Sequence, residues 1–421
     1  MRIEIVTIGD ELLLGFTIDT NAAYLARELA AVGVEIVRRS TVGDSPGGIA
    51  KAVGDALART GAVITTGGLG PTSDDLTKAS IAALFGRTML SDEGIAAELK
   101  ERWGRLKRPG HFPQSNLVQA MIPEGAVILP NRHGTAPGIW LEDEVGRWAA
   151  MLPGVPREMR EMFSAELLPR IRDRASDMAD GVETVILSRT LRTVGIAESA
   201  LADELGTLAG GVDGLSVAFL PGVTGVDLRL TSRALDLPAA TAALSAAAMK
   251  LRASIGRYVY GENDDDLAAV VLDLCRRRSL RIAVAESCTG GMLGERITAV
   301  PGASDVFIGG VLAYDNSVKS GWLGVRDEDL AEHGAVSEVV AKAMAKEARV
   351  RFGAGIGIAI TGVAGPAGGT EQKPVGTIWI AIDAGSITQA YCRMSFGTRE
   401  EIRQRAVQAA LDMVRRTLET G

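Results

Sequence analysis

The stretch Ala62–Leu76, AVITTGGLGPTSDDL, is the part of the sequence that decides the fold. Its first five residues are apolar or β-branched, as in a buried strand; glycines follow, and a helical pattern runs over residues 76–84. The same order occurs before it, with RIEIVTI at residues 2–8, a helical pattern at 21–31 and VEIVRRSTVG at 34–43. Alternation of strand and helix predicts a mostly parallel sheet with helices on both faces.

The rest of the chain predicts two further domains. A polar stretch at residues 170–181 (RIRDRASDMADG) precedes a small α+β unit in which no catalytic motif is found. Strand and helix patterns alternate again from about residue 261. The expected α/β fold has two domains with mostly parallel sheets, at residues 1–172 and 261–421, joined by a connecting domain at 173–260.

Composition excludes several classes of protein. The formal net charge of -7 argues against direct binding to nucleic acid, which requires a concentrated basic surface. The three cysteines are widely separated and provide neither a disulfide framework nor a metal-binding spacing. The amino-terminal residues lack the pattern of a signal peptide, and no apolar run approaches the roughly 18 residues of a membrane span. A cytoplasmic protein without a membrane partner is expected.

The glycine loop after AVITT is the first candidate site. Backbone N–H groups at a helix start bind anionic oxygens, and the adjacent carboxylates of Asp74 and Asp75 suit a hard cation such as Mg²⁺. Polar residues also end the two preceding strands, at residues 9–11 and 41–44, and parallel strands share one carboxyl edge. The alternative is that Ser73 and Asp74 only cap the helix.

The second candidate site is AESCTGG at residues 285–291, where Ser287 stands beside Cys288. A reactive cysteine usually has a histidine or another cation nearby. His333 stands before a glycine in a pattern typical of a helix end, so a pair of Cys288 with His333 is poorly supported. Cys288 is therefore interpreted as a packing residue. A serine needs a base, and GGVLAYDNSVK at 309–319 supplies Tyr314 and Lys319. A buried lysine can lose its proton near neutral pH. The glycines at 290 and 291 would supply oxyanion donors. Alternatively, Lys319 is solvated and Ser287 only caps a helix.

Several motifs in the first 170 residues together resemble one known domain. GDELLLG, DTNAAYLA, STVGD, TTGGLGPTSDDLT, NRHGTAPG and LPGVPREM look like the amino-terminal domain of the competence/damage-inducible protein A (CinA) family, which is similar to molybdopterin-binding domains. The resemblance implies hydrolysis of ADP-ribose to AMP and ribose 5-phosphate with a divalent metal, Mg or Co. It assigns phosphate binding to Gly67, Gly68, Gly70 and Thr72, and metal binding to Glu11, Asp44, Asp74 and Asp75.

The last third resembles the carboxy-terminal domain of the same family. AESCTGG, GGVLAYDNSVK, HGAVSE, ITGVAGPAGGTEQKPVGT and GTREEIRQRAV occur in that order, as in nicotinamide-mononucleotide amidohydrolases, which need no cofactor. The resemblance implies Ser287 as nucleophile, activated by Lys319 and Tyr314. It counts Thr361 among the catalytic residues, where this residue and the Gly362 loop place the nicotinamide end. It assigns substrate binding to Gly290, Gly291, Gly310, Asn316, Gly362 and Arg399, of which Arg399 pairs with the 5′-phosphate.

Three further expectations accompany the resemblance. It implies a homodimer. Asp315 stands where family members often have serine, and its carboxylate is expected to raise the pKa of Lys319. Two alternatives stay open: the first domain binds a pterin or nucleotide without hydrolysing it, or the chain is a non-enzymatic partner in DNA uptake or damage responses.

Overall fold

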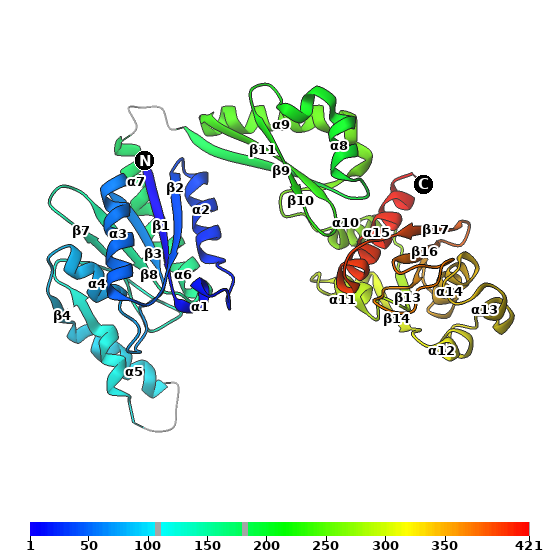
Figure 1. The fold of residues 1–421 in the computed structure, drawn as a ribbon, viewed down its shortest axis with the longest axis horizontal. Helices are drawn as coiled ribbons and strands as arrows, with labels where there is room; N and C mark the ends of the chain where they lie inside the picture. Colours follow the sequence, from blue (N-terminus) through cyan, green and yellow to red (C-terminus); the bar gives the residue numbers. More distant parts are fainter. Residues whose placement is uncertain (106–110, 179–183, 421) are drawn as a thin grey trace. The chain divides into compact units, whose positions relative to one another are not determined.

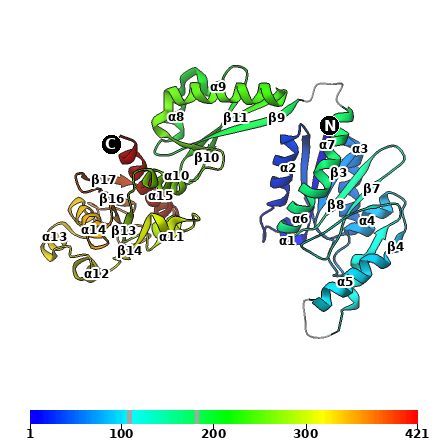
Figure 2. The ribbon, with the colours of Figure 1, turned by 180° about the vertical axis from the view of Figure 1, so that it is seen from behind.

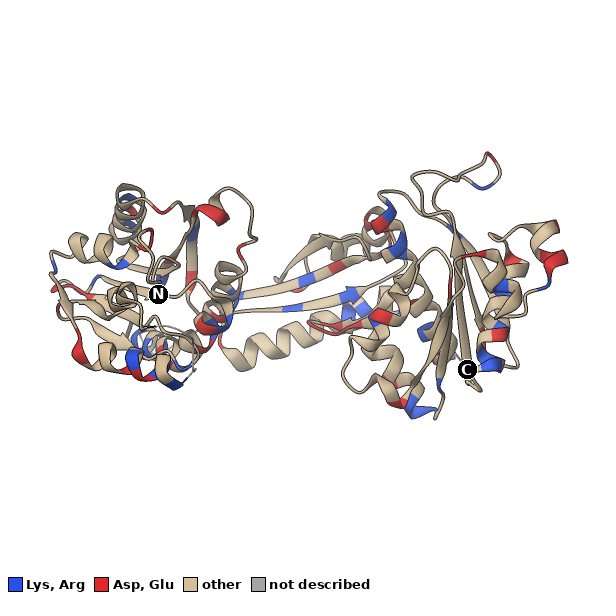
Figure 3. Cartoon of the chain, turned by 90° about the horizontal axis from the view of Figure 1, so that it is seen from below, with Lys and Arg blue, Asp and Glu red and all other residues tan. Residues whose placement is uncertain are grey.

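The computed structural model describes residues 1–105, 111–178 and 184–420. These residues form two compact units, residues 1–187 with 232–242, and residues 188–231 with 243–421 (Figures 1 and 2). Basic and acidic residues are interspersed along the helices and strands of both units (Figure 3). Within the described ranges, no helix combines the length and apolar character needed to cross a bilayer. The polar stretch predicted at the first domain boundary continues as helix to Met178, and its last residues lie outside the described ranges.

A six-stranded sheet with the order β2-β1-β3-β8-β7-β6 is the centre of the first unit. Its strands are β1 (Arg2–Ile8), β2 (Glu35–Val42), β3 (Ala62–Thr66), β6 (Val127–Leu129), β7 (Gly138–Glu142) and β8 (Trp148–Leu152). A small hairpin pairs β4 (Met89–Ser91) with β5 (Met121–Pro123). The helices are α1 (Asp10–Leu13), α2 (Asn21–Ala31), α3 (Pro46–Thr60), α4 (Thr77–Leu84), α5 (Glu93–Arg105), η1 (Gln114–Ala120), α6 (Pro156–Met162), η2 (Phe163–Leu167) and α7 (Leu168–Met178).

Helices cover both faces of this sheet, as the alternation of strand and helix predicts. Leu25 of α2 and Met159 of α6 pack with Ile3 and Ile5 on one face. On the other face, α3 and α4 pack against Val6, Ile8 and Val63 of the same sheet, with Val53 in that cluster. Because helices cover both faces, β1 is buried at every position after Arg2.

The middle region contains a four-stranded sheet with the order β10-β11-β9-β12. Its strands are β9 (Val185–Thr193), β10 (Ser216–Pro221), β11 (Val226–Leu235) and β12 (Val259–Glu262), with helices α8 (Glu198–Leu205), η3 (Gly206–Gly210), α9 (Leu237–Ile255) and η4 (Gly256–Tyr258). This is the small α+β arrangement that the sequence predicts.

A five-stranded sheet with the order β14-β13-β15-β16-β17 organises the last third of the chain. Its strands are β13 (Ile282–Glu286), β14 (Phe307–Leu312), β15 (Ile356–Gly362), β16 (Thr377–Asp383) and β17 (Thr388–Met394). The helices are α10 (Leu267–Arg277), α11 (Met292–Thr298), η5 (Ala303–Asp305), α12 (Asn316–Gly321), α13 (Asp327–His333), α14 (Glu338–Arg351) and α15 (Arg399–Thr420). Helices α10, α11 and α15 share one hydrophobic cluster with the sheet, and α14 belongs to the cluster on the other face.

Both large sheets are parallel at their centre and antiparallel at one side. Strand β1 pairs in parallel with β2 and β3, and β13 pairs in parallel with β14 and β15. Strands β7 with β8, and β16 with β17, are antiparallel neighbours joined by short turns. A connection of a few residues cannot make a parallel crossover, so these two hairpins are antiparallel. The pairings of β6 with β7 and of β15 with β16 are antiparallel as well, and the prediction of mostly parallel sheets did not include these sides.

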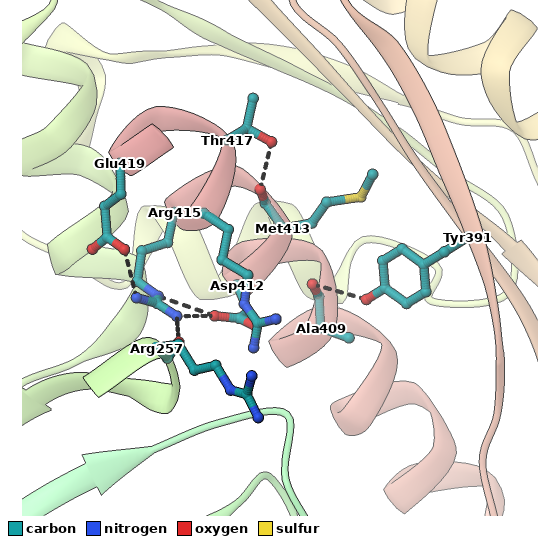
Figure 4. Close-up of polar contacts among 9 residues, drawn as sticks. Arg257, Tyr391, Ala409, Asp412, Met413, Arg415, Thr417 and Glu419 are labelled. Atoms are coloured by element: carbon teal, nitrogen blue, oxygen red, sulfur yellow. Dashed lines mark hydrogen bonds and ion pairs between the residues drawn. The ribbon is translucent and has the colours of Figure 1, made fainter. Parts of the chain in front are cut away.

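Helix α15 is held against the middle region by a buried arginine (Figure 4). Arg415, with 1% of its surface exposed, donates to Asp412 at 2.7 Å, to Glu419 at 2.7 Å and to the carbonyl of Arg257 at 3.0 Å. A guanidinium out of water needs several acceptors, and two carboxylates and a carbonyl supply them.

Candidate active sites

The glycine loop of the first unit turns sharply after β3. Gly67 and Gly68 have φ values of 110° and 64°, in the left-handed region that favours glycine. A Cβ atom would lie 2.0 Å from the Ile8 carbonyl oxygen at Gly67 and 2.2 Å from the Thr77 hydroxyl at Gly68. The loop therefore requires glycine at both positions, for conformation and for space.

A carboxylate of the loop itself closes the turn. Asp75 accepts hydrogen bonds from the Gly70 amide at 2.7 Å and the Thr72 amide at 2.8 Å, and a short one from the Thr72 hydroxyl. The sequence assigned Asp75 to metal, and Gly70 and Thr72 to phosphate. In the structure these three groups bind each other, so Asp75 stabilises the loop and the two amides are already engaged.

The other predicted metal ligands lie near one another. The amide of Asp10 donates to the carboxylate of Asp44 at 2.9 Å, and the amide of Asp44 donates to Asp10 at 3.2 Å. Burial raises the pKa of Asp44, and repulsion from Asp10, Glu11 and Asp74 raises it further against the opposing hydrogen bond. The negative charges of these acids therefore repel that of Asp44 and oppose its ionisation.

A cavity of about 500 Å³ opens at this edge of the sheet. Among the described residues, its lining includes no lysine, arginine or histidine and six carboxylates, those of Glu11, Asp19, Asp44, Asp74, Asp75 and Glu158. Asn21 also lines it, and its buried Oδ1 has no hydrogen-bond partner. An anionic ligand would meet strong repulsion here unless a cation accompanied it.

The donor set suits a hard divalent cation by charge and by oxygen chemistry. Glu11, Asp44 and Asp74 are the residues that would hold it. Across the described part of the chain, no three histidine, cysteine or acidic side chains already stand close enough together to bind a metal. The charges favour a metal, whereas the complete ligand set is not preformed.

The second site begins where β13 ends. The amide of Ser287 donates to the Ile360 carbonyl at 2.9 Å, and the Ser287 carbonyl accepts from the Gly290 amide at 3.1 Å. The chain thus turns tightly after the serine, which has 8% of its surface exposed. Burial raises the pKa of the neighbouring Cys288 thiol to about 12, so the thiol stays neutral, and the interpretation of Cys288 as a packing residue is confirmed.

Lys319 lies on α12 and is 1% exposed, so the alternative in which it is solvated is wrong. Its Nζ donates to the carbonyl oxygens of Ala313 at 2.8 Å and Tyr314 at 3.1 Å. Burial lowers the pKa of Lys319; Asp315 and Cys288 oppose this electrostatically, and Asp315 therefore acts in the direction that the sequence predicts. A neutral amine has two N–H groups and one lone pair, so the two carbonyls leave the lone pair available.

The glycine amides of AESCTGG are not free oxyanion donors. Glu286 is fully buried, and its carboxylate accepts from the amides of Gly291 at 3.1 Å, Leu293 at 3.0 Å and Gly294 at 2.8 Å. The Gly290 amide is bound to Ser287. The expectation that Gly290 and Gly291 supply these donors is wrong for this structure, as is the alternative that Ser287 caps α11, whose first amides bind Glu286.

Tyr314 and Arg399 are brought together. Arg399 donates to the Tyr314 hydroxyl at 3.0 Å and to the Gly365 carbonyl at 2.6 Å. The tyrosine is 63% exposed, and its hydroxyl is bound to the guanidinium. Arg399 is the first residue of α15 and lies one helical turn before Arg403. Arg403 donates to the Thr289 carbonyl at 2.6 Å.

The remaining predicted residues have mixed surroundings. Thr361 is fully buried and donates to the Ala335 carbonyl at 2.8 Å. Gly310 and Gly362 are strand glycines at which a Cβ would lie 2.3 Å from Val284 and 2.4 Å from Ile378, so tight packing explains them. Asn316 is exposed at the start of α12.

Comparison with known proteins identifies the family. The family models "Probable molybdopterin binding domain", "Damage-inducible protein CinA KH domain" and "CinA C-terminal domain" match residues 4–173, 188–261 and 264–418. A "CinA-like protein" of Gemmatimonas aurantiaca is 63% identical over 99% of this chain and 96% of its own length. The chain belongs to the CinA family.

A second relative matches over the same extent, and a solved structure matches about a third of the chain. A "Putative competence-damage inducible protein" of Moorella thermoacetica is 40% identical, with 99% of each chain covered. The crystal structure of a competence/damage inducible protein from Agrobacterium tumefaciens is 37% identical over 36% of this chain and 93% of its own, with a TM-score of 0.35. The two full-length relatives confirm the resemblance read from the sequence motifs as membership of the competence/damage-inducible protein family.

Sequence reasoning missed three polar residues of the CinA sites. Asp10 and Glu286 both stand in quoted motifs, and an acid next to a glycine turn is a signal for amide binding that went unused. Arg403 was not predicted; its position four residues after Arg399 places both on one face of a helix. Its buried Nε has no hydrogen-bond partner, and neither does the buried hydroxyl of Thr289.

Proposed function

We propose that the carboxy-terminal domain hydrolyses the carboxamide of nicotinamide mononucleotide to nicotinate mononucleotide and ammonia. The observation that carries this proposal is the environment of Lys319, a fully buried amine with a lowered pKa on α12. Glu286 pairs with Leu312 in the parallel register of β13 and β14, so Ala313, whose carbonyl accepts from Lys319, and Ser287 follow neighbouring strand ends. A hydroxyl nucleophile needs such a base, and the adjacent thiol with a pKa of about 12 is a poor rival.

The steps follow from these groups. The lone pair of Lys319 takes the proton as the Ser287 oxygen bonds to the carboxamide carbon. The C–N bond then breaks and the nitrogen leaves as ammonia with the proton that Lys319 carried, which leaves an acyl group on Ser287. Water, deprotonated by the same amine, attacks this ester and releases the carboxylate. Arg399, oriented by Gly365 and Tyr314, would bind the 5′-phosphate.

The amino-terminal domain, in the same proposal, hydrolyses ADP-ribose at its pyrophosphate in the acidic cavity. A divalent cation, when bound, screens the phosphate charge and polarises the phosphorus centre. Glu11, Asp44 and Asp74 would hold the cation, and the carboxylates that do not bind it would orient water. Gly67 and Gly68 allow the backbone to approach the phosphates closely.

The deciding experiment is an ammonia assay on Ser287→Ala with nicotinamide mononucleotide, with nicotinamide and glutamine as control substrates. We expect loss of ammonia release in this variant and unchanged release in Ser320→Ala, whose hydroxyl donates to the Asn316 carbonyl on the same helix. Near-normal deamidation by Ser287→Ala would refute the serine assignment.

The amino-terminal activity is tested separately. ADP-ribose is incubated with the full chain and a phosphatase, with Mg²⁺, with Co²⁺ or with EDTA, and released phosphate is measured. Metal-dependent release that Ser287→Ala retains and Asp74→Asn loses supports hydrolysis. If phosphate appears under none of these conditions, the domain is a binding module without this activity.

A further inference from the structure

A second cavity of about 480 Å³ adjoins the acidic one and has the opposite charge. It lies along α5, and its lining includes three arginines and one glutamate, Arg102, Arg105, Arg132 and Glu98. The acidic cavity has six carboxylates and, in the part of the chain that the structure describes, no basic side chain. Two neighbouring cavities of one domain therefore attract ligands of opposite charge.

The turn at residues 131–136 separates the two cavities. Thr135 lines both of them. Asn131, which lines the second cavity, donates to Glu158 of the first at 2.7 Å and to the Ala136 carbonyl at 2.8 Å. Arg102 donates to the carbonyl oxygen of Gly134 on the same turn. Hydrogen bonds from Asn131 and Arg102 therefore hold this turn, and the two cavities meet at Thr135.

The rest of the lining indicates what the second cavity would hold. Ile95, Leu99, Ile128, Pro130 and Pro137 form apolar walls beside the guanidinium groups. Arg132 is 70% exposed and has only a long ion pair, 3.8 Å, with Glu166, so its fork is available to a ligand. Guanidinium groups bind phosphate in a bidentate manner, and apolar walls suit a base or sugar.

We propose that one nucleotide ligand occupies both cavities. Its pyrophosphate lies in the acidic cavity, and a phosphomonoester on its nucleoside lies in the second cavity. This inference rests on the proposed function of the first domain and narrows its substrate class. The preferred ligand then carries a third phosphate, as in ADP-ribose phosphorylated at the 2′-hydroxyl of its adenosine. The arginine cavity needs no metal to attract this group, in contrast to the acidic cavity.

The test compares binding of adenosine 2′,5′-bisphosphate and AMP to the full chain by calorimetry, in EDTA and in Mg²⁺. We expect the bisphosphate to bind at least about tenfold tighter than AMP even in EDTA, since one good arginine–phosphate contact is worth about 1.4 kcal/mol or more. Arg132→Gln should remove most of that difference. Arg147→Gln, which changes an exposed arginine paired with Asp143 and outside both cavities, should preserve it.

Equal affinity for the two nucleotides in the unmodified protein would overturn the proposal, as would equal effects of Arg132→Gln and Arg147→Gln. Failure of the ADP-ribose assay together with a retained preference for the bisphosphate would remove the hydrolase proposal alone. Loss of the preference together with intact ADP-ribose hydrolysis would remove only the arginine subsite.

Discussion

The two candidate sites use the same local architecture with opposite electrostatics. In each, a buried strand ends in a glycine turn whose amides bind a carboxylate of the chain itself, Asp75 in the first domain and Glu286 in the last. The first turn faces a cavity lined by acids, and the second leads to a buried amine and two arginines. A glycine turn after a strand is therefore not an anion site by itself, because its own acids can occupy the amides first.

Removal of the amine should have the largest effect and would show whether the second site depends on a base. Lys319→Met should lower kcat/KM for deamidation by roughly 10²–10⁴, the usual contribution of a general base. Lys342→Met, at an exposed ion pair with Glu338, is the control. A thermal melt establishes that both variants are folded. If deamidation in Lys319→Met stays within a few fold of the unmodified protein, another group is the base.

The hydrogen bonds that the Glu286 carboxylate accepts at the second turn can be weakened by a side chain of the same shape. Glu286→Gln exchanges one acceptor oxygen for an N–H₂ group that faces amide donors, so the free energy of unfolding should fall by about 1–3 kcal/mol. Asp273→Asn, at an exposed ion pair on α10, should change it little. Denaturant unfolding followed by circular dichroism measures both. An unchanged stability for Glu286→Gln would mean that these hydrogen bonds do not hold the turn.

In the acidic cavity, removal of a carboxylate charge should raise the stability of the fold, in contrast to Glu286→Gln. Because the pKa of Asp44 is raised, ionisation of its carboxyl lowers the stability of the folded state. The stability that the protonated carboxyl contributes is fully present below the unfolded pKa of 3.8 and is lost as pH rises through the folded pKa. Without metal, Asp44→Asn should therefore melt slightly higher than the unmodified protein at pH 7, and the gain should disappear in acid. Added Mg²⁺ or Co²⁺ should raise the melting temperature of the unmodified protein only. An equal metal-induced rise in both proteins would exclude Asp44 as a ligand.

The smallest expected effect is a shift in pH dependence at the second site. Asp315 raises the pKa of Lys319, whereas burial lowers it more. Asp315→Asn keeps an acceptor for the Ser317 amide and removes the charge, so the pKa of Lys319 should fall further. The rising limb of kcat/KM against pH should then move to lower pH, with a modest gain in rate at pH 7. A shift to higher pH would contradict the assignment of Lys319 as base.

Much of the fold could be predicted from the sequence because periodic burial is a local property. The strand at residues 2–8 and the helix at 21–31 are found where their apolar patterns indicate. The antiparallel sides of the two large sheets were not predicted, since pairing direction depends on which strands meet. Of the candidate site, the motifs located Ser287, Lys319 and the glycine turn of the first domain.

The sequence by itself determined the family, the α/β class and the positions of the chemically capable residues, because these depend on residue type and spacing along the chain. Only the tertiary structure decided which groups are already engaged. Burial lowers the pKa of Lys319. The carboxylates of Asp75 and Glu286 accept hydrogen bonds from amides that the motifs predicted to be available to a ligand, and arginines line a cavity beside the acidic one. Those outcomes depend on desolvation and on contacts between segments far apart in the chain, and no local pattern records them.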